Sequence, residues 1–161
     1  MGIPSYFSHI IKEYRTIIQT LQKLQCVDNL YLDSNSIIYD VIHGYDKIPS
    51  NMNSIYHDIC KKIDNYIETC NVEKYIMIAF DGVAPVAKLE QQRTRRFKTT
   101  LLSKITKNIK EDKTSIKFDT TCITPGTEFM TSMCNYIKNY YRSNKKVILS
   151  LSDESGEGEH K

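Results

Sequence analysis

Acidic side chains stand directly after three short apolar runs of the sequence. They are Asp33, Asp81 and Asp153, and the third is followed closely by Glu157 and Glu159. Carboxylate oxygens are the ligands that Mg²⁺ and Mn²⁺ prefer, and acids gathered at one place repel one another unless a cation is bound. In nucleases two such ions, roughly 3.5–4 Å apart, activate the attacking water and stabilise the leaving oxygen. If these acids meet in the fold, they predict a metal site suited to hydrolysis of phosphodiester bonds.

Glycines flank the last two acids, in the segment Gly156-Glu157-Gly158-Glu159. Acids two residues apart in an extended segment share one side, and the glycines allow the backbone to approach a ligand closely. Two ordinary explanations stay open, because an Asp after a strand often caps the next helix or forms an Asx-turn, and a lone GEGE segment can be a solvated loop. Three apolar runs that end in the same way favour the metal site.

A basic segment follows the second acid. Residues 88–117 contain ten Lys or Arg and three acids, a net charge of +7, although the whole chain carries only +3. If the segment is helical, one face of it presents Lys88, Gln92, Arg95 and Arg96. Arginine supplies paired donors and lysine a point charge, as a terminal phosphate requires. An isolated run of this kind is more often a solvated helix face, but its place beside an acid cluster favours phosphate binding.

Apolar periodicity predicts the elements that position these side chains. Short apolar runs predict three buried strands, at residues 29–33, 75–81 and 146–153. Apolar residues spaced three and four apart predict helices at 7–24, 55–67, 86–110 and from Pro125 to about Tyr141. Alternating strands and helices predict one α/β domain over residues 1–161, with a parallel sheet covered by helices on both faces. Ligands of such sheets bind beyond the carboxyl ends of the strands, where the acids lie.

Composition excludes several classes of protein. A chain of 161 residues with 40% hydrophobic residues fits one compact domain. We expect no membrane span, because no apolar run reaches roughly eighteen residues, and residues 1–5 lack the features of a signal peptide. The five cysteines include no C-x-x-C pair, which argues against a disulfide framework and a zinc knuckle and fits a reducing compartment.

The sequence resembles the Xrn family of 5'-3' exoribonucleases in five motifs, which occur in the family's order. The motifs are MGIP, NLYLDSNSII, FDGVAPVAKLEQQRTRRF, CITPGTEFM and SGEGEHK. This resemblance implies a nuclease core related to PIN and flap-endonuclease folds, which uses Mg²⁺ or Mn²⁺ to hydrolyse single-stranded RNA from a 5'-monophosphate end. The implied metal-binding and catalytic acids are Asp33, Asp81, Glu157 and Glu159. The implied 5'-phosphate pocket consists of Lys88, Gln92, Arg95 and Arg96. We expect Asn35, beside the first acid, to be a supporting polar contact.

The sequence departs from the family pattern at a few positions. Tyr39 stands where the family usually has a His associated with stacking on the first base, and because a tyrosine ring also stacks on bases we expect altered rather than lost function. Val86 and Ser155 replace a basic residue and a proline that are common there, and neither is an implied ligand. The sequence stops at Lys161, before the family's later aspartates. This end is consistent with a piece of a longer protein or with a truncated, inactive product, and the stop directly after a motif favours the first. In either case we expect an incomplete nuclease core whose four acids hold one ion.

Three functions are consistent with these patterns. The first is hydrolysis of 5'-monophosphorylated RNA to nucleoside 5'-monophosphates, in messenger RNA decay in the cytoplasm, with the nucleus as the other compartment. The second is a non-catalytic module that binds the 5' end of RNA, and activity with added Mg²⁺ separates it from the first. The third is a flap-type DNA nuclease, which shares the acids but gives no reason for the QQRTRRF segment to match the RNA family.

Overall fold

A computed structural model describes residues 5–18, 26–109 and 118–161 of the chain. Its centre is a parallel three-stranded sheet formed by β1 (Val27–Asp33), β2 (Val72–Ala79) and β3 (Val147–Ser150), in the order β1-β2-β3. Leu32 of β1 pairs with Ile78 of β2, which pairs with Leu149 of β3. The predicted α/β class with a parallel sheet is confirmed, but among the described residues helices pack against only one of the two faces that the sequence predicted to be covered.

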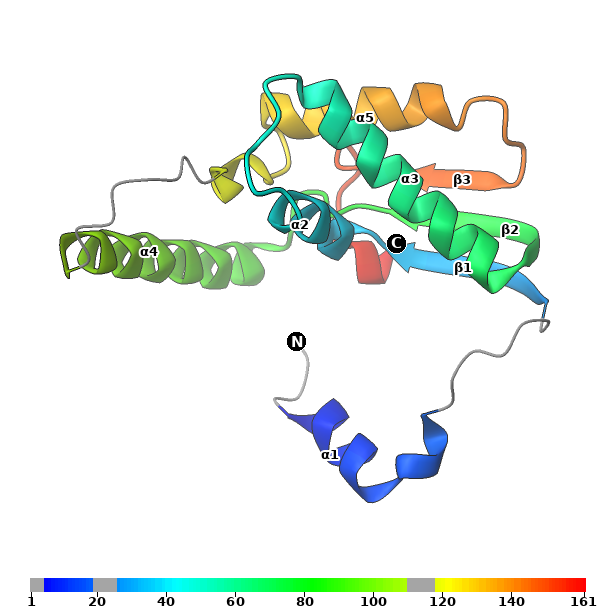
Figure 1. Ribbon diagram of the computed structural model, residues 1–161, viewed down its shortest axis with the longest axis horizontal. Helices are drawn as coiled ribbons and strands as arrows, with labels where there is room; N and C mark the ends of the chain where they lie inside the picture. The colour runs from blue at the N-terminus through cyan, green and yellow to red at the C-terminus, as the bar shows by residue number, and fades with distance from the viewer. Residues whose placement is uncertain (1–4, 19–25, 110–117) are drawn as a thin grey trace.

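Two crossover connections join the strands and contain most of the helices. Between β1 and β2 the chain forms α2 (Asn35–His43) and α3 (Met52–Cys70). Between β2 and β3 it forms α4 (Val86–Ile109), the short 3-10 helix η2 (Thr120–Cys122) and α5 (Glu128–Tyr140). Figure 1 shows α3 and α5 along one face of the sheet and α4 projecting from the carboxyl end of β2. The carboxyl ends of the strands, where the acids lie, are therefore next to the basic helix α4.

The core lies between the sheet and the helices α2, α3 and α5. Ile55, Ile59 and Ile63 of α3 recur every fourth residue, and each is 0% exposed, as the apolar periodicity predicts. Ile78 of β2 and Phe80 just after it are also fully buried. Burial of each such side chain contributes ~1.5–3 kcal/mol. This packing gives the residues that follow the strands a rigid support.

The other face of the sheet carries exposed apolar side chains. Tyr31, Met77 and Ile148 lie opposite one another across the three strands. Tyr31 is 75% exposed and Ile148 is 48% exposed. Successive side chains of a strand point to opposite faces, so these residues alternate with the buried ones.

The predicted continuous helix at residues 7–24 is wrong over the part that the structure describes. Helix α1 (Tyr6–Glu13) ends before Tyr14, whose φ of −123° and ψ of 63° are not helical, and the 3-10 helix η1 (Arg15–Ile17) follows. Residues 19–24 of the predicted helix lie outside the described residues. Helix α1 buries none of its residues and is set apart from the sheet in Figure 1. Short helices without packing are marginal in water, so periodicity alone did not extend this one.

Other boundaries differ from the predicted ones for local reasons. Strands β1 and β2 start earlier than predicted, and the apolar pattern missed these starts because they contain polar residues, including Lys74 and Asp28, which pair across the strands at 2.8 Å. Strand β3 is shorter than predicted and ends at Ser150. Helix α5 starts later than Pro125, because the Thr127 side chain caps its N-terminus by accepting a hydrogen bond from the third helical residue. None of the helices among the described residues is long and apolar enough to cross a membrane.

Candidate metal and phosphate site

The structure brings the four predicted acids together at the carboxyl edge of the sheet. Asp33 ends β1, Asp81 lies just after β2, and the segment after β3 carries Glu157 and Glu159 on either side of Gly158. The Gly158 backbone N–H donates to Oδ1 of Asp81 at 2.8 Å. A Cβ at Gly158 would lie only 2.4 Å from Oδ1 of Asp33. The segment that carries the two glutamates therefore contacts the first two acids through a backbone that leaves no room for a side chain.

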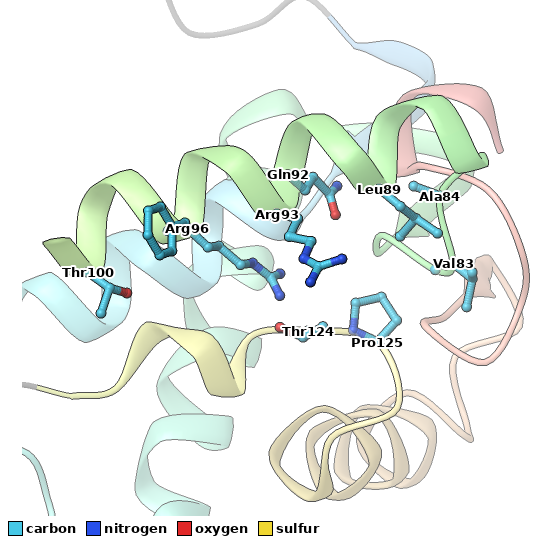
Figure 2. A pocket seen from close by; sticks show the side chains of 11 residues that line it. Val83, Ala84, Leu89, Gln92, Arg93, Arg96, Thr100, Thr124 and Pro125 are labelled. Carbon is cyan, nitrogen blue, oxygen red and sulfur yellow. The ribbon is translucent and has the colours of Figure 1, made fainter.

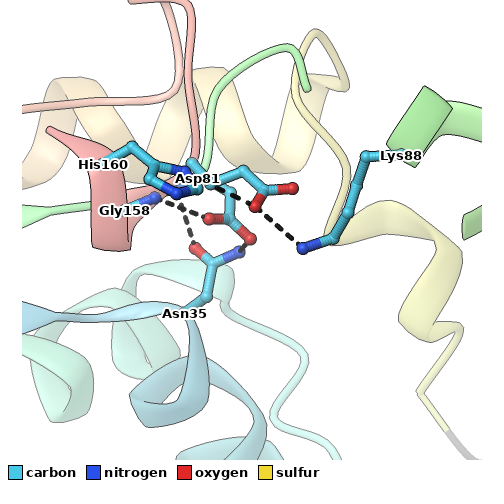
Figure 3. A network of polar contacts seen from close by, with 6 residues as sticks. Asn35, Asp81, Lys88, Gly158 and His160 are labelled. Atoms are coloured by element: carbon cyan, nitrogen blue, oxygen red, sulfur yellow. Dashed lines mark hydrogen bonds and ion pairs between the residues drawn. The ribbon is translucent and has the colours of Figure 1, made fainter. Parts of the chain in front are cut away.

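Asn35 orients Asp81 through two hydrogen bonds. Its side-chain amide nitrogen donates to Oδ2 of Asp81 at 2.6 Å, and its Oδ1 accepts from the Asp81 backbone N–H at 3.1 Å. Figure 3 shows this pair together with the contact from Gly158. Both carboxylate oxygens of Asp81 thus accept a hydrogen bond, each from a different segment. The sequence indicated Asn35 as a support beside the first acid, whereas the structure shows it supporting the second.

Glu157 is the most buried acid of the group, with 6% exposure. Its Oε2 accepts a hydrogen bond from Nζ of Lys88 at 2.8 Å and lies 3.8 Å from Nδ1 of His160. Figure 3 shows Lys88 extending from α4 toward this group. Oε1 of Glu157 is buried and has no hydrogen-bond partner among the described residues. An unpartnered buried carboxylate oxygen is costly, and a bound cation would remove that cost.

The donor set fits a hard divalent cation. Glu157, Glu159 and His160 each have a ligand atom within 4.8 Å of the others. Desolvation, followed by the charges of Asp81, Glu159 and Glu157, raises the pKa of the Asp33 carboxyl, and a nearby cation would act in the opposite direction. Carboxylate oxygens predominate, which suits Mg²⁺ or Mn²⁺. His160 was not among the predicted ligands, although its position directly after Glu159 was an available signal.

Asp153 does not join the acid group. Its carboxylate pairs with Nζ of Lys138 at 3.0 Å on the surface, and this hydrogen bond lowers its pKa. Strand β3 ends at Ser150, and the backbone then turns, with the Glu154 N–H donating to the Leu151 carbonyl at 3.1 Å. The turn explains why an acid that follows the third apolar run does not share the site of the other two.

Lys161 and Gly82 hold the segment that carries the glutamates against the end of β2. Nζ of Lys161 donates to the carbonyls of Phe80 at 2.9 Å and Leu151 at 2.6 Å. The Gly82 N–H donates to the Gly156 carbonyl at 2.8 Å, and the nearby Glu154 carbonyl, 1.6 Å from where a Cβ would lie, leaves no room for a side chain at Gly82. These contacts position the acids without being ligands, and the sequence alone did not indicate them.

The predicted phosphate residues of α4 point to different places. Lys88, in the first turn, contacts Glu157, and this hydrogen bond raises the pKa of its ammonium group. Gln92 and Arg96 line a cavity of about 720 Å³ between α4 and the turn at 124–125 (Figure 2). Arg95, although described, is not among the residues that line it. The structure therefore brings two of the four together in one cavity and places a third against the acids.

Tyr39 lies on α2 and is 38% exposed. Its ring meets the edge of His43 with centroids 6.4 Å apart. Asn35 and Tyr39 are four residues apart, so they lie on the same side of α2. The exposed ring is therefore on the side of the helix that contacts Asp81, and its role in base stacking stays a prediction.

An acid group at the carboxyl edge of a parallel α/β sheet, beside a basic helix, defines a nuclease domain of the PIN-like class. The chain belongs to the XRN 5'-3' exonuclease family, whose N-terminal region matches residues 1–161. The membership predicted from the five motifs is thus confirmed, although MGIP lies outside the described residues.

Individual relatives agree with this family. The chain is 36% identical over 181 residues to 5'-3' exoribonuclease 1 of Saccharomyces cerevisiae, covering 100% of this chain and 12% of that protein. It is 34% identical over 182 residues to 5'-3' exoribonuclease 1 of Homo sapiens, covering 100% of this chain and 11% of that protein. For 5'-3' exoribonuclease 2 of Gallus gallus the identity is 32% over 210 residues, and the coverage is 100% of this chain and 22% of that protein. The chain therefore spans less than a quarter of the length of these relatives.

Proposed function

We propose that this chain is the catalytic segment of a metal-dependent 5'-3' exoribonuclease that converts 5'-monophosphorylated single-stranded RNA to nucleoside 5'-monophosphates. The observation that carries the proposal is Oε1 of Glu157, which is buried without a partner among the described residues, in a group of possible metal ligands that also contains Glu159 and His160. Beside that group, the basic helix α4 lines a cavity with Gln92 and Arg96. The relatives named above, which are 5'-3' exoribonucleases, support the same chemistry.

The residues of the proposed site have separate roles. A bound Mg²⁺ or Mn²⁺ would supply Lewis-acid stabilisation of the charge that develops on the phosphate. The residues that would hold it are Asp33, Asp81, Glu157 and Glu159. Asn35 and the Gly158 N–H keep Asp81 in one orientation. The cavity on α4 holds the 5'-phosphate, so that the next phosphodiester bond is presented to the acids, and such positioning is itself a large part of catalysis.

Selectivity for the RNA end follows from the same arrangement. A terminal monophosphate carries two negative charges, which the arginine and lysine side chains of α4 match. The exclusion of triphosphate and capped ends is implied by the family resemblance, because a cavity of about 720 Å³ does not exclude a triphosphate by size. Tyr39 would stack on the first base. We place this activity in cytoplasmic messenger RNA decay, with the nucleus as the other compartment.

A binding-only function is the second candidate, and one contact favours it. Lys88 already neutralises the most buried acid, Glu157, at 2.8 Å. A chain in which that ion pair persisted would recognise the RNA end without hydrolysing it. Selective binding of 5'-phosphorylated RNA without product would therefore support this second function.

The test is a digestion time course on RNAs that differ only at the 5' end, which carries a monophosphate, a hydroxyl or a triphosphate. We expect release of single nucleotides from the monophosphate RNA alone, with Mg²⁺ and not with EDTA. Asp81→Ala should abolish release, while Asp153→Ala, a matched change at an acid outside the group, should not. Equal hydrolysis of all three RNAs would contradict the proposed end recognition, and cleavage of a DNA flap in preference to RNA would favour a flap-type nuclease.

A further inference from the structure

One face of the sheet, here called the open face, has no covering layer among the described residues. It is formed by Tyr31, Tyr75, Met77 and Ile148, which point away from α3 and α5 because the alternate positions, such as Ile78, are buried in the core. Tyr31, Tyr75 and Ile148 are 75%, 56% and 48% exposed. Contiguous exposed apolar side chains of this kind mark a contact surface.

Helix α1 carries an apolar side that is likewise uncovered. Phe7, Ile10, Ile11 and Tyr14 are spaced at i, i+3, i+4 and i+7, so they share one side of the helix and of the residue that ends it. Phe7 is 70% exposed and Tyr14 is 62% exposed, and none of the eight residues of α1 is buried. An isolated helix of this length is marginal in water, so it needs an apolar surface to pack against.

The geometry of the chain allows α1 to reach the open face. Figure 1 shows α1 on the side of the sheet opposite α3 and α5. Ile18 and Cys26 are eight residues apart in the chain, so the tether between them spans at most ~26–29 Å. The eight residues of α1 are about 12 Å long, and the seven residues of β1 are about 23 Å long. The helix therefore fits along the open face within the reach of its tether.

We propose that α1 docks on the open face of its own chain, so that its apolar side covers Tyr31, Met77 and Ile148. This contact would complete the second helical layer that the sequence predicts. A short tether gives two surfaces an effective concentration of about the millimolar range, which favours contact within one chain over contact with a second copy at micromolar concentration. Asp33 follows Tyr31 by two residues and lies on the same side of β1, so the docked helix would border the acid group. The proposal concerns the fold and does not depend on RNA hydrolysis.

The test uses a tryptophan reporter, because the 161-residue chain contains no tryptophan. Phe7→Trp places the indole on α1, and Phe97→Trp places it on α4, where Phe97 is 71% exposed. The two rings are almost equally exposed when α1 is undocked, so a difference between the two reporters measures docking. Docking should shift the emission of Phe7→Trp to a shorter wavelength than that of Phe97→Trp and should reduce its quenching by acrylamide.

Changes on the open face should reverse that shift. Tyr31→Thr combined with Ile148→Thr removes two apolar side chains but keeps residues that favour strands, so the sheet should persist. In this background Phe7→Trp should emit at the wavelength of the exposed reporter. Val83→Thr, at a position that is 59% exposed and lies outside the open face, is the matched control and should leave the emission unchanged. Far-UV circular dichroism checks that each variant is folded, and Ile148→Thr alone gives the same test if the double change unfolds the chain.

Three results would overturn the proposal. Equal emission and equal quenching of Phe7→Trp and Phe97→Trp would show that α1 stays in water. A shorter-wavelength emission that the changes on the open face leave unaltered would show that α1 packs on another surface. A shift that disappears on dilution would assign the contact to a second copy of the chain.

Discussion

Gly158→Ala tests whether the four acids act as one site. Gly158 separates Glu157 from Glu159, and its N–H donates to Asp81. A Cβ at this position would lie 2.4 Å from Oδ1 of Asp33, whereas ordinary contact begins at 3.4 Å. The difference of about 1 Å must be absorbed by Asp33 or by the segment that carries both glutamates. Either movement separates groups that the metal would have to bind together.

The magnitude follows from that displacement. A misplacement of about 1 Å in an active site costs on the order of 10²-fold in rate, and overpacking costs about 1–3 kcal/mol of stability. We therefore expect Gly158→Ala to lower RNA hydrolysis about a hundredfold and the free energy of unfolding by ~1–3 kcal/mol. It should also weaken Mn²⁺ binding, measured by electron paramagnetic resonance of the free ion. Urea denaturation gives the unfolding free energy.

Gly44→Ala is the matched control. Gly44 follows α2 with a φ of −74°, and a Cβ there would meet the Val41 carbonyl at 3.3 Å. This variant should leave Mn²⁺ binding unchanged. Unchanged Mn²⁺ binding and hydrolysis in Gly158→Ala would refute the reasoning that its neighbours form one site. A loss of unfolding free energy alone would limit Gly158 to a packing role.

Three further predictions address the surroundings of the site and the core. Lys88→Met removes the cation next to the buried Glu157, so the melting temperature of the variant in EDTA should be lower than that of the unchanged chain. Added Mg²⁺ should raise the melting temperature of the variant more than that of the unchanged chain. An equal rise in the two proteins would contradict this prediction. Tyr141→Phe removes a buried hydroxyl whose single O–H lies within hydrogen-bond distance of two acceptors, the Cys60 carbonyl and Oδ1 of Asp64, and urea denaturation should show a loss of ~1–3 kcal/mol; a change within error would show that this hydroxyl does not stabilise the fold. Burial raises the pKa of the Cys60 thiol to about 12, so the neutral thiol persists at pH 8, and mass spectrometry should find it labelled by a thiol reagent only after unfolding.

Apolar periodicity predicted the helices and strands that are stabilised by burial of an apolar face. Ile55, Ile59 and Ile63 made α3 predictable because one face of that helix is fully buried. The same reasoning failed for α1, which has a similar apolar spacing but buries no residue among those described. Polar strand starts such as Asp28 were also missed, because an ion pair between strands leaves no mark in the apolar pattern.

The sequence predicted where the candidate site lies but not which side chains contact one another there. Parallel strands end at one edge, so Asp33 and Asp81 were expected to meet. Which acid of the third segment joins them depends on the turn after β3, and that turn leaves Asp153 paired with Lys138 on the surface. Likewise, whether Arg93 or Arg95 lines the cavity depends on the rotation of α4 about its axis, which a run of charged residues does not reveal.

The strands lie in the sheet in the same order as in the chain. Each strand therefore adds to an edge that already exists, and no strand has to insert between two others. Because N-terminal segments fold first during synthesis, β1 and β2 can pair under α3 before β3 has left the ribosome. The four acids leave the ribosome in chain order, Asp33 first and Glu157 with Glu159 last. A nascent chain that has emerged only through β2 thus lacks Glu157 and Glu159, and the four acids can meet only after β3 has joined the sheet.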